Sequence, residues 1–222
     1  MKIAVILSGC GVRDGSEIHE SVTALLCMDQ AGHQVQMFAP NKPQTAVIDG
    51  ITGKAQNEIR NILVESARIA RGNIRDLDSL NVNDFDAIVL PGGFGAATNL
   101  CDFATKGPEC TVDKTLENIL KNAQKANKVM GFMCIAPVIA ARVFGEQHVR
   151  MTIGNDPATA AACETMGAEH VSCTYQEACV DERLKVVTTP AYMLAASIAQ
   201  CYESAQAMLR AVERLVSSSR LP

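Results

Sequence analysis

The sequence predicts an α/β fold in which helices cover both faces of an open, mostly parallel β-sheet, giving a three-layer α/β/α sandwich. Two observations lead to this prediction: short apolar runs alternate with segments of helical period, and the runs are nearly continuous in apolarity, as in strands buried on both faces. Because ligands bind beyond the carboxyl ends of such strands, we expect three turns, 8–17, 91–98 and 132–137, to lie side by side.

The first part of the chain supplies two strands and two helices. Residues 2–7 and 33–40 are predicted strands, and residues 57–71 form a predicted helix that ends at Gly72. Between the two strands lies a helix with Ser16 as its expected N-cap. An apolar stripe on this helix is expected to face the core: Ile18, Val22, Leu25 and Leu26.

The second part repeats this pattern and ends in a helix. Residues 84–100 contain an apolar strand, a glycine turn and a helix start, and 100–113 form a predicted surface loop that could serve as a lid. The remaining predicted elements are a helix at 114–126, a strand at 129–133, a helix from about Pro137, a hairpin of 177–180 with 184–190, and a terminal helix at 191–216.

Composition limits the classes of function. The chain has 222 residues, 48% of them hydrophobic, and we expect one domain over 1–222. The net charge is −4 with both signs interspersed, so neither nucleic acid nor an anionic membrane is an expected partner. The start is too short in apolar residues for a signal peptide, and no run is long enough to span a membrane, so a cytoplasmic location is expected. The nine cysteines stand without C-x-x-C pairs, which favours reduced thiols and no bound metal.

The glycine-rich turn after the first strand could be read as a phosphate cradle. Gly9, Gly11 and Gly15 approach a dinucleotide fingerprint, but the spacing is one residue too long and the helix begins only near Ser16. The second strand also ends without the acid that would hold a ribose. We therefore expect no nucleotide cofactor.

Cys134 is the predicted nucleophile. It stands directly after an apolar strand and just before a helix, the arrangement of a nucleophile elbow, with Gly131 and Ala136 as small neighbours. A thiol near a helix N-terminus is expected to have a lowered pKa. Cys10 is the rival, because it too follows a strand, but it is far from any helix start. Three more cysteines lie in helical patterns and are expected in the core: Cys27, Cys163 and Cys201.

Four motifs carry a family resemblance. The segments "LSGCGVRDGSEIHE", "LPGGFGAATNL", "GFMCIAP" and "TPAYM" resemble the ElbB-like branch of the ThiJ/PfpI superfamily, which are class I glutamine-amidotransferase-like proteins with a flavodoxin-like fold. The resemblance implies Cys134 as the elbow nucleophile and Glu17 as the acid that contacts its sulfur. It also implies an oxyanion or substrate-binding site made by the amides of Gly93 and Ile135, with Gly92 beside them.

The resemblance also implies an activity. ElbB-like proteins are described as glyoxalases, so the expected function is a lyase that converts glyoxal to glycolate through a Cys134 hemithioacetal, without cofactor, in a homodimer with a link to isoprenoid metabolism. The base is Glu17 or His19. Ile135 stands where many members have histidine, and residues 188–193 contain none, which argues against glutamine hydrolysis. Two further hypotheses stay open: a redox-sensing or protein-binding module that uses Cys134 and Glu17, and an amidotransferase-like subunit.

Overall fold

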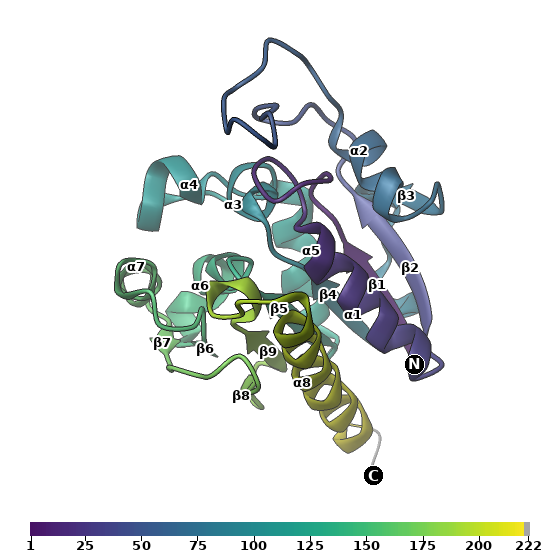
Figure 1. The fold of residues 1–222 in the computed structure, drawn as a ribbon. Coiled ribbons are helices and arrows are strands. Elements are labelled where there is room, and N and C mark those ends of the chain that lie inside the picture. The colour runs from purple at the N-terminus through teal and green to yellow at the C-terminus, as the bar shows by residue number, and fades with distance from the viewer. Residues whose placement is uncertain (220–222) are drawn as a thin grey trace.

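The computed structural model describes residues 1–219 and confirms the predicted fold, a flavodoxin-like three-layer sandwich (Figure 1). Its sheet has seven strands in the described residues, of which β8 alone is antiparallel to its neighbour. Across the sheet the strands are β3 (Ile74–Asp76), β2 (Gln34–Ala39), β1 (Lys2–Ile6), β4 (Ala87–Leu90), β5 (Val129–Met133), β9 (Val186–Thr189) and β8 (Cys179–Asp181). The last residues of the predicted domain, 220–222, lie outside the described residues.

Helices cover both faces of the sheet because successive strand residues point to opposite sides. On β1, Ile3 and Val5 pack into one core, whereas Ala4 and Ile6 pack into the other. The first core is closed by α1 (Ile18–Gln30), α2 (Ile62–Ile69) and α8 (Ile198–Ser218); the second by α3 (Phe94–Thr98), α5 (Lys114–Lys125) and α6 (Pro137–Phe144). Two further helices and a small parallel sheet flank the second face: α4 (Phe103–Lys106), α7 (Pro157–Thr165), β6 (Arg150–Met151) and β7 (Glu169–His170).

The chain reverses its direction across the sheet at β1, which pairs with β2 on one side and β4 on the other. This is the switch point at which α/β sheets place their ligands. Backbone hydrogen bonds tie the neighbouring turns together: the Glu17 amide donates to the Gly92 carbonyl at 2.9 Å, and the Gly95 amide donates to the Gly15 carbonyl at 2.9 Å. The prediction that these turns lie side by side is confirmed.

The predicted orientation of the first helix was wrong. Ile18, Val22 and Leu26 are 43–49% exposed, so most of the stripe expected in the core faces outward, whereas Leu25 is half-buried against the core. The buried face instead carries smaller and polar residues, namely Glu20, Ser21, Thr23, Ala24, Cys27 and Met28. Helix α8 packs against α1. The buried face of α8 also carries small residues, so the two helices can pack closely.

Several predicted boundaries also change. Glu17, not Ser16, caps α1, because the Ser16 hydroxyl accepts a hydrogen bond from the Ser8 amide instead. Helix α2 begins at Ile62 after an Asn61 cap. The segment 100–113 is not wholly loop, since it contains α4 and a 3₁₀ turn at 107–109. The β8–β9 hairpin is confirmed, whereas the terminal helix begins at 198 after the 3₁₀ turn η5 (Ala191–Met193).

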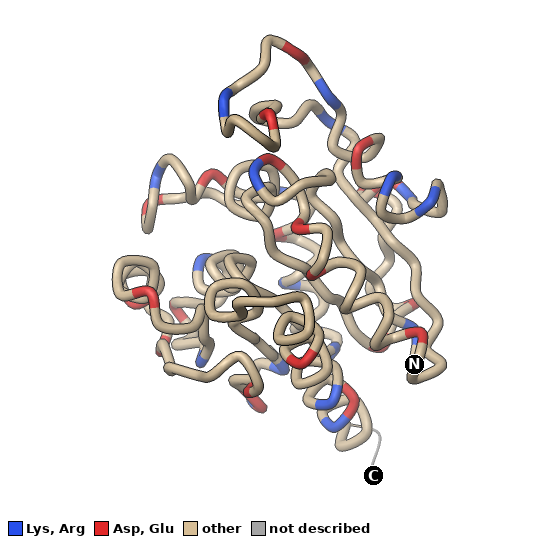
Figure 2. The backbone as a smooth tube through the Cα atoms, viewed as in Figure 1, with Lys and Arg blue, Asp and Glu red and all other residues tan. Residues whose placement is uncertain are grey.

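Charged residues of both signs are interspersed along the chain (Figure 2). Over the described range, 1–219, no helix combines the length and the apolar character that crossing a membrane requires. The candidate site lies at the edge of the sheet where β1, β4 and β5 end.

Candidate active site

Cys134 lies at the carboxyl end of β5 in a strained turn. Its φ is +59°, in the left-handed region that L-residues with side chains avoid, at a cost of roughly 1–3 kcal/mol. The turn is held by the Cys134 amide, which donates to the Thr189 carbonyl at 2.9 Å. Gly92 leaves room for the side chain, because a Cβ at Gly92 would lie 2.5 Å from the Cys134 Cβ. This geometry is that of the predicted nucleophile elbow.

The carboxyl of Glu20 is a polar partner of the Cys134 thiol. Glu20 is fully buried, and each of its oxygens accepts a backbone hydrogen bond: Oε2 from the Gly92 amide at 2.9 Å and Oε1 from the Tyr192 amide at 3.2 Å. The same carboxyl hydrogen-bonds the Cys134 side chain. Three separate segments therefore fix this carboxyl against the sulfur.

Burial controls the titration of this pair. It raises the pKa of Glu20 to about 7, although the hydrogen bonds from Tyr192, Cys134 and Gly92 oppose the change. Burial and the neighbouring Glu20 carboxylate raise the pKa of the Cys134 thiol well above its ordinary value. The predicted lowering of the thiol pKa by a helix terminus is thus wrong, because loss of water outweighs it. The two groups hold a single proton between them over a wide pH range.

Glu17 does not have the contact that the family resemblance implied. Its side chain caps α1, with Oε2 accepting from the Glu20 amide at 2.7 Å, and it lines the pocket in front of Cys134. The carboxyl that hydrogen-bonds the sulfur belongs to Glu20, one helical turn further along. Helical period could have found it: an acid at 20 lies on one face with Ala24, Cys27 and Met28.

Two backbone amides point at the sulfur, those of Gly93 and Ile135. Both hydrogen bonds lower the pKa of Cys134, so they favour negative charge at this place. Gly92 has a different role from the expected one, because its amide is already engaged by Glu20. A Cβ at Gly93 would meet the Glu17 amide nitrogen at 2.3 Å, so only glycine lets the two turns approach this closely.

His19 lies at the rim rather than at the sulfur. Its Nδ1 is 2.8 Å from the Tyr192 hydroxyl, and Tyr192 in turn lines the pocket. His19 can therefore act on a bound molecule only through Tyr192 or by a change of position.

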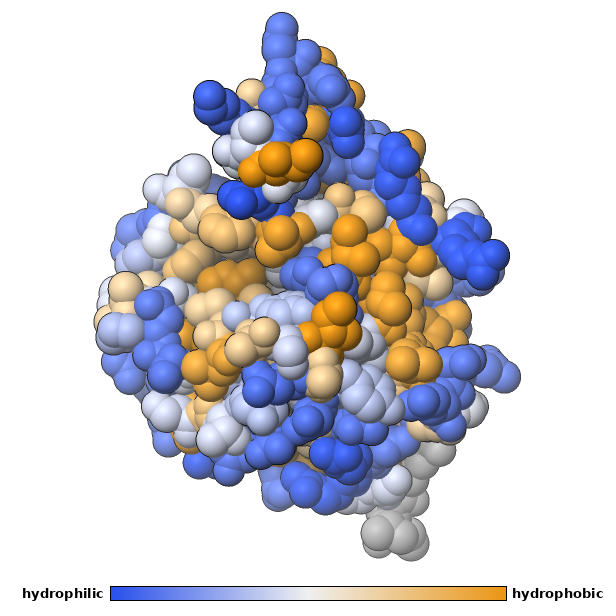
Figure 3. Space-filling model, in the orientation of Figure 1, coloured by the Kyte–Doolittle hydropathy of each residue, from blue (hydrophilic) through white to orange (hydrophobic). Residues whose placement is uncertain are grey.

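The pocket in front of Cys134 has a volume of about 430 Å³, within the range of about 300–1,000 Å³ typical of small-molecule sites. Figure 3 shows this face of the molecule hollowed, with hydrophobic residues around the hollow. The walls come from the first turn, α3, α4, the elbow, α7 and η5: Val12, Glu17, Gly93, Phe94, Ala97, Phe103, Ala104, Cys134, Ile135, Thr159, Tyr192 and Met193.

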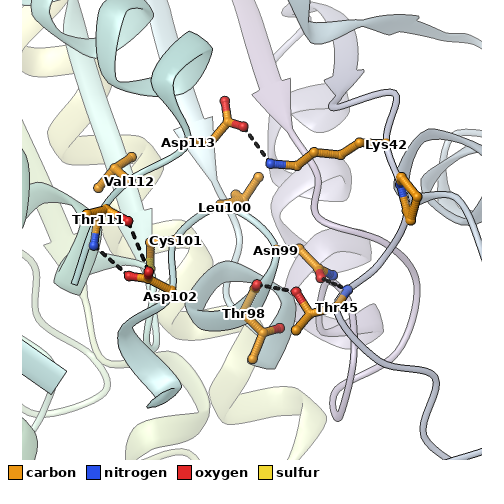
Figure 4. A pocket seen from close by; sticks show the side chains of 11 residues that line it. Lys42, Thr45, Thr98, Asn99, Leu100, Cys101, Asp102, Thr111, Val112 and Asp113 are labelled. Carbon is orange, nitrogen blue, oxygen red and sulfur yellow. Dashed lines mark hydrogen bonds and ion pairs between the residues drawn. The ribbon is translucent and has the colours of Figure 1, made fainter. Parts of the chain in front are cut away.

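A second, more polar pocket of about 320 Å³ lies between the segment after β2 and residues 98–113 (Figure 4). Its charges are already paired, since Lys42 Nζ lies 2.5 Å from Asp113 Oδ2. The thiol of Cys101 in this pocket donates a hydrogen bond to the Ala96 carbonyl. A hydrogen bond with the Cys110 thiol and burial raise the pKa of the Cys101 thiol. This pocket offers no activated nucleophile.

The glycine turn after β1 is closed by hydrogen bonds within the turn and to α2. The Gly11 amide donates to the Ser16 carbonyl at 2.8 Å, the Gly15 amide to the Gly11 carbonyl at 2.8 Å, and the Gly9 amide to the Ser66 hydroxyl at 2.9 Å. These amides are therefore not directed at a phosphate. Among residues 1–219, no three His, Cys, Asp or Glu side chains are grouped as metal ligands.

Comparison with known proteins extends the likeness over almost the whole chain. No protein-family model matches it. The human mitochondrial glutamine amidotransferase-like class 1 domain-containing protein 3 is 44% identical over 224 residues, covering 96% of this chain and 83% of that protein. An isoprenoid biosynthesis protein with amidotransferase-like domain from Ehrlichia chaffeensis is 34% identical, with a TM-score of 0.91 over 97% of this chain and 99% of that one. Drosophila melanogaster DJ-1beta is 17% identical, with a TM-score of 0.53 over 100% and 98% of the two chains, and shares the fold.

Proposed function

Because this chain belongs to the glutamine amidotransferase-like class 1 family, within the ThiJ/PfpI superfamily that its motifs resemble, we propose that it is a cofactor-independent glyoxalase-type lyase that converts glyoxal to glycolate. One observation carries the proposal: Cys134 lines a pocket, and its thiol is hydrogen-bonded to the buried Glu20 carboxyl, with two amides directed at the sulfur. That set supplies a nucleophile, a proton carrier and an oxyanion site.

The first step is addition. Glu20 takes the thiol proton, and the Cys134 thiolate bonds to one aldehyde carbon of glyoxal. The carbonyl oxygen becomes negatively charged next to the amides of Gly93 and Ile135, which are already directed at the sulfur. The Glu20 proton then passes to this oxygen and gives a neutral hemithioacetal. A carboxyl with a pKa of about 7 suits both transfers near neutral pH.

The second step moves a proton between the two carbons. A base removes the hydrogen from the carbon bonded to sulfur, and a proton is added to the neighbouring carbon, giving a thioester beside an alcohol. Water then releases glycolate and the free thiol, so the sum is glyoxal plus water giving glycolate plus a proton, with no external oxidant. We assign the base to Glu17, because its carboxyl lines the pocket whereas His19 lies behind Tyr192.

Glutamine hydrolysis is less well supported. It requires a histidine within hydrogen-bond reach of the cysteine thiol, and residues 188–193, where the triad histidine of amidotransferases is expected, contain none. The residues that line the pocket in the described chain also include no histidine, and Ile135 stands where many superfamily members have one. The amidotransferase likeness therefore describes ancestry and fold, and we do not extend that activity to this chain.

The test is glycolate formation from glyoxal by purified protein freed of small molecules, followed by NMR. Wild type is expected to form glycolate at a rate that Cys134→Ser reduces to the level without protein. Equal rates for wild type and Cys134→Ser would refute the proposal. Glu17→Gln is expected to lower kcat by about 10²-fold or more, and a smaller effect than for His19→Gln would move the base to His19.

A second candidate function is that of a redox sensor. It is favoured by the hydrogen bond between the Glu20 carboxyl and the Cys134 sulfur. If Cys134 were oxidised by peroxide to a sulfinate, protonated Glu20 could donate a strong hydrogen bond to it. Peroxide titration with peptide mass mapping tests this, since a sensor role requires Cys134 to gain two oxygens before the other cysteines are modified.

Three further expectations remain proposals. A link to isoprenoid metabolism is supported by the name of the Ehrlichia protein, which is 34% identical. A homodimer is proposed from the family resemblance and is tested by light scattering. The third proposal is a cytoplasmic location. The human relative is named as mitochondrial, so microscopy of the tagged natural protein is the test that decides between the two compartments.

A further inference from the structure

Cys173 and Cys179 form a pair of thiols outside the site described above. Cys179 is in β8, the strand at one edge of the large sheet, and Cys173 lies in the segment 171–178 that leads from β7 to β8. A hydrogen bond joins the two thiol side chains, and both cysteines are free. The protein therefore carries a dithiol at the edge of its sheet.

The backbone holds the two cysteines in this arrangement. The Val171 amide donates to a carbonyl of β6 at 2.8 Å, so the start of the segment continues the pairing of β6 with β7. The Cys173 side chain then hydrogen-bonds that of Thr152. The Thr152 amide in turn donates to the Thr188 hydroxyl at 2.8 Å, and Thr188 is the β9 partner of Cys179. Both cysteines are thus fixed to the same place beside β9.

A turn between the cysteines closes the segment. The Glu177 amide donates to the Thr174 carbonyl at 3.1 Å. The Glu177 carboxylate accepts hydrogen bonds from the Thr174 amide at 2.8 Å and from the Thr174 hydroxyl at 3.0 Å. This turn reverses the chain between Cys173 and Cys179, which lets their side chains meet.

Exposure separates this dithiol from a second pair of hydrogen-bonded thiols, Cys101 and Cys110. Cys101 is 5% and Cys110 is 0% exposed, so both sulfurs are shielded from solvent. Cys179 is also buried, at 4%, but Cys173 is half-buried and partly open to solvent. A soluble oxidant can therefore reach one member of the Cys173–Cys179 dithiol while the other stays protected.

The surroundings favour a thiolate on Cys173. A hydrogen bond with the Cys179 thiol lowers the pKa of Cys173 to about 7, against the opposing effect of burial. Hydrogen bonding to Thr152 and the charge of Arg150 add to the lowering, whereas the Glu177 carboxylate opposes it. The hydrogen bond with Cys173 raises the pKa of Cys179, so Cys179 keeps its proton. One thiol is therefore prepared to attack and its neighbour holds a proton.

We propose that Cys173 and Cys179 are a redox site that a peroxide converts reversibly to a disulfide. The Cys173 thiolate attacks one peroxide oxygen, the O–O bond breaks, and Cys173 becomes a sulfenic acid while hydroxide leaves. The Cys179 thiol then loses its proton and attacks the Cys173 sulfur, and the sulfenic oxygen leaves as water. In sum, one thiolate, one thiol and hydrogen peroxide give a disulfide, one water and one hydroxide.

This site is independent of the proposed function, but it bears on the redox candidate at Cys134. Cys134 is buried, and burial and the neighbouring Glu20 raise the pKa of its thiol, so Cys173 is expected to be oxidised first. That order would refute a sensor role for Cys134 and would not affect its role as the nucleophile.

The first test is peptide mapping of the wild-type protein after titration with hydrogen peroxide, with the remaining thiols blocked by iodoacetamide. Glu177 lies between the two cysteines, so cleavage after glutamate gives two peptides that only a disulfide joins. We expect these joined peptides, and dithiothreitol should separate them. The proposal fails if Cys173 and Cys179 both stay reduced up to the peroxide concentration that oxidises Cys10.

Substitution of each cysteine assigns its role. Cys179→Ser keeps a donor near Cys173 and removes the second sulfur, so a sulfenic acid should persist on Cys173 and be trapped by dimedone. Cys10→Ser, a matched control at another half-buried cysteine, should leave disulfide formation unchanged. Trapping of Cys179 in Cys173→Ser as fast as trapping of Cys173 in Cys179→Ser would overturn the assignment of Cys173 as the attacking thiol.

A third variant tests the contact between the two thiols. Cys179→Ala removes the hydrogen-bond donor as well as the sulfur, so the thiolate on Cys173 is no longer favoured. Alkylation of Cys173 by iodoacetamide at pH 7 should be about fivefold slower in Cys179→Ala than in wild type. Cys101→Ala, at the second pair of thiols, should leave the rate at Cys173 unchanged. Equal rates in wild type and Cys179→Ala would contradict the dithiol contact on which the proposal rests.

Discussion

The turns that follow β1 and β5 each carry a cysteine at the carboxyl end of a buried parallel strand, yet the surroundings of Cys10 and Cys134 differ. Cys134 is buried at a left-handed backbone position, against Glu20 and two amides. Cys10 is half-buried between two glycines of positive φ, and burial followed by the Glu65 carboxylate raises the pKa of its thiol. Cys10 also lines neither of the two pockets described above.

This difference shows that a cysteine after a strand is only part of a nucleophile site. The turn after β1 has a supporting function: backbone hydrogen bonds of Gly15 and Glu17 hold it against the turn after β4, and it leads into the helix that carries Glu20. The turn after β5 supplies the sulfur. The acid from the helix that follows one turn and the sulfur from the other turn meet at the switch point of the sheet.

The largest expected effect separates the two cysteines directly. Cys134→Ser should lower kcat/KM for an α-oxoaldehyde by at least about 10³-fold, because the nucleophile is lost. Cys10→Ser should change it by less than about threefold. Comparable losses in the two variants, measured by initial rates of 2-hydroxy acid formation, would break the distinction.

Exchange of the acids tests the assignment of Glu20. Glu20→Gln keeps the size of the side chain and removes the proton carrier, so kcat should fall by about 10²-fold or more. In this variant the pH profile of kcat should also lose its limb near pH 7, since Glu20 has a pKa of about 7. A limb near pH 7 that persists in Glu20→Gln and disappears in Glu17→Gln would return the role to Glu17.

Glycine substitutions compare the two turns by stability. Gly92→Ala should cost about 2–4 kcal/mol, because its Cβ would lie 2.5 Å from the Cys134 Cβ in a region without free space. Gly11→Ala meets only the Asp14 side chain at 3.1 Å and should cost about 1 kcal/mol through its φ of +136°. Urea unfolding measures both, and a larger cost at Gly11 would contradict the packing described.

The smallest expected effect is the pH dependence that Glu20 gives to stability. Its pKa rises on folding from 4.5 to about 7, so the native state binds more protons than the unfolded state between these values. Stability should therefore fall as pH rises through that interval, by an amount on the order of 1–3 kcal/mol. Glu20→Gln should flatten this part of the curve, and an unchanged slope in urea titrations at pH 5 and 7.5 would contradict the burial of an ionisable acid.

The sequence was sufficient to predict the layers and the site edge because strand and helix periods are local signals. It predicted Cys134 for the same reason, since strand, turn and helix start are adjacent in the chain. Elements of two or three residues, such as β3, β6 and β7, are too short to show a period, and α7, although longer, was not predicted either.

The acid was missed because both faces of α1 contain apolar residues. The larger side chains, Ile18 and Leu26, favoured the wrong face, whereas the buried face packs the smaller Ala24 and Cys27 against α8. With the correct face, Glu20 becomes a buried acid on the core side, which is a strong sign of function. The pKa direction at Cys134 depends on desolvation by distant segments, which no local pattern reports.

The measurement that tests the central claim most directly is the pH dependence of Cys134 alkylation by iodoacetamide, read by peptide mapping in wild type and Glu20→Gln. Glu20 raises the pKa of the thiol by its charge and its hydrogen bond, so its removal should shift the profile to lower pH. The expected result is an alkylation rate at pH 7 that is about tenfold or more higher in Glu20→Gln than in wild type. Coincident profiles for the two proteins would show that Cys134 and Glu20 do not share a proton.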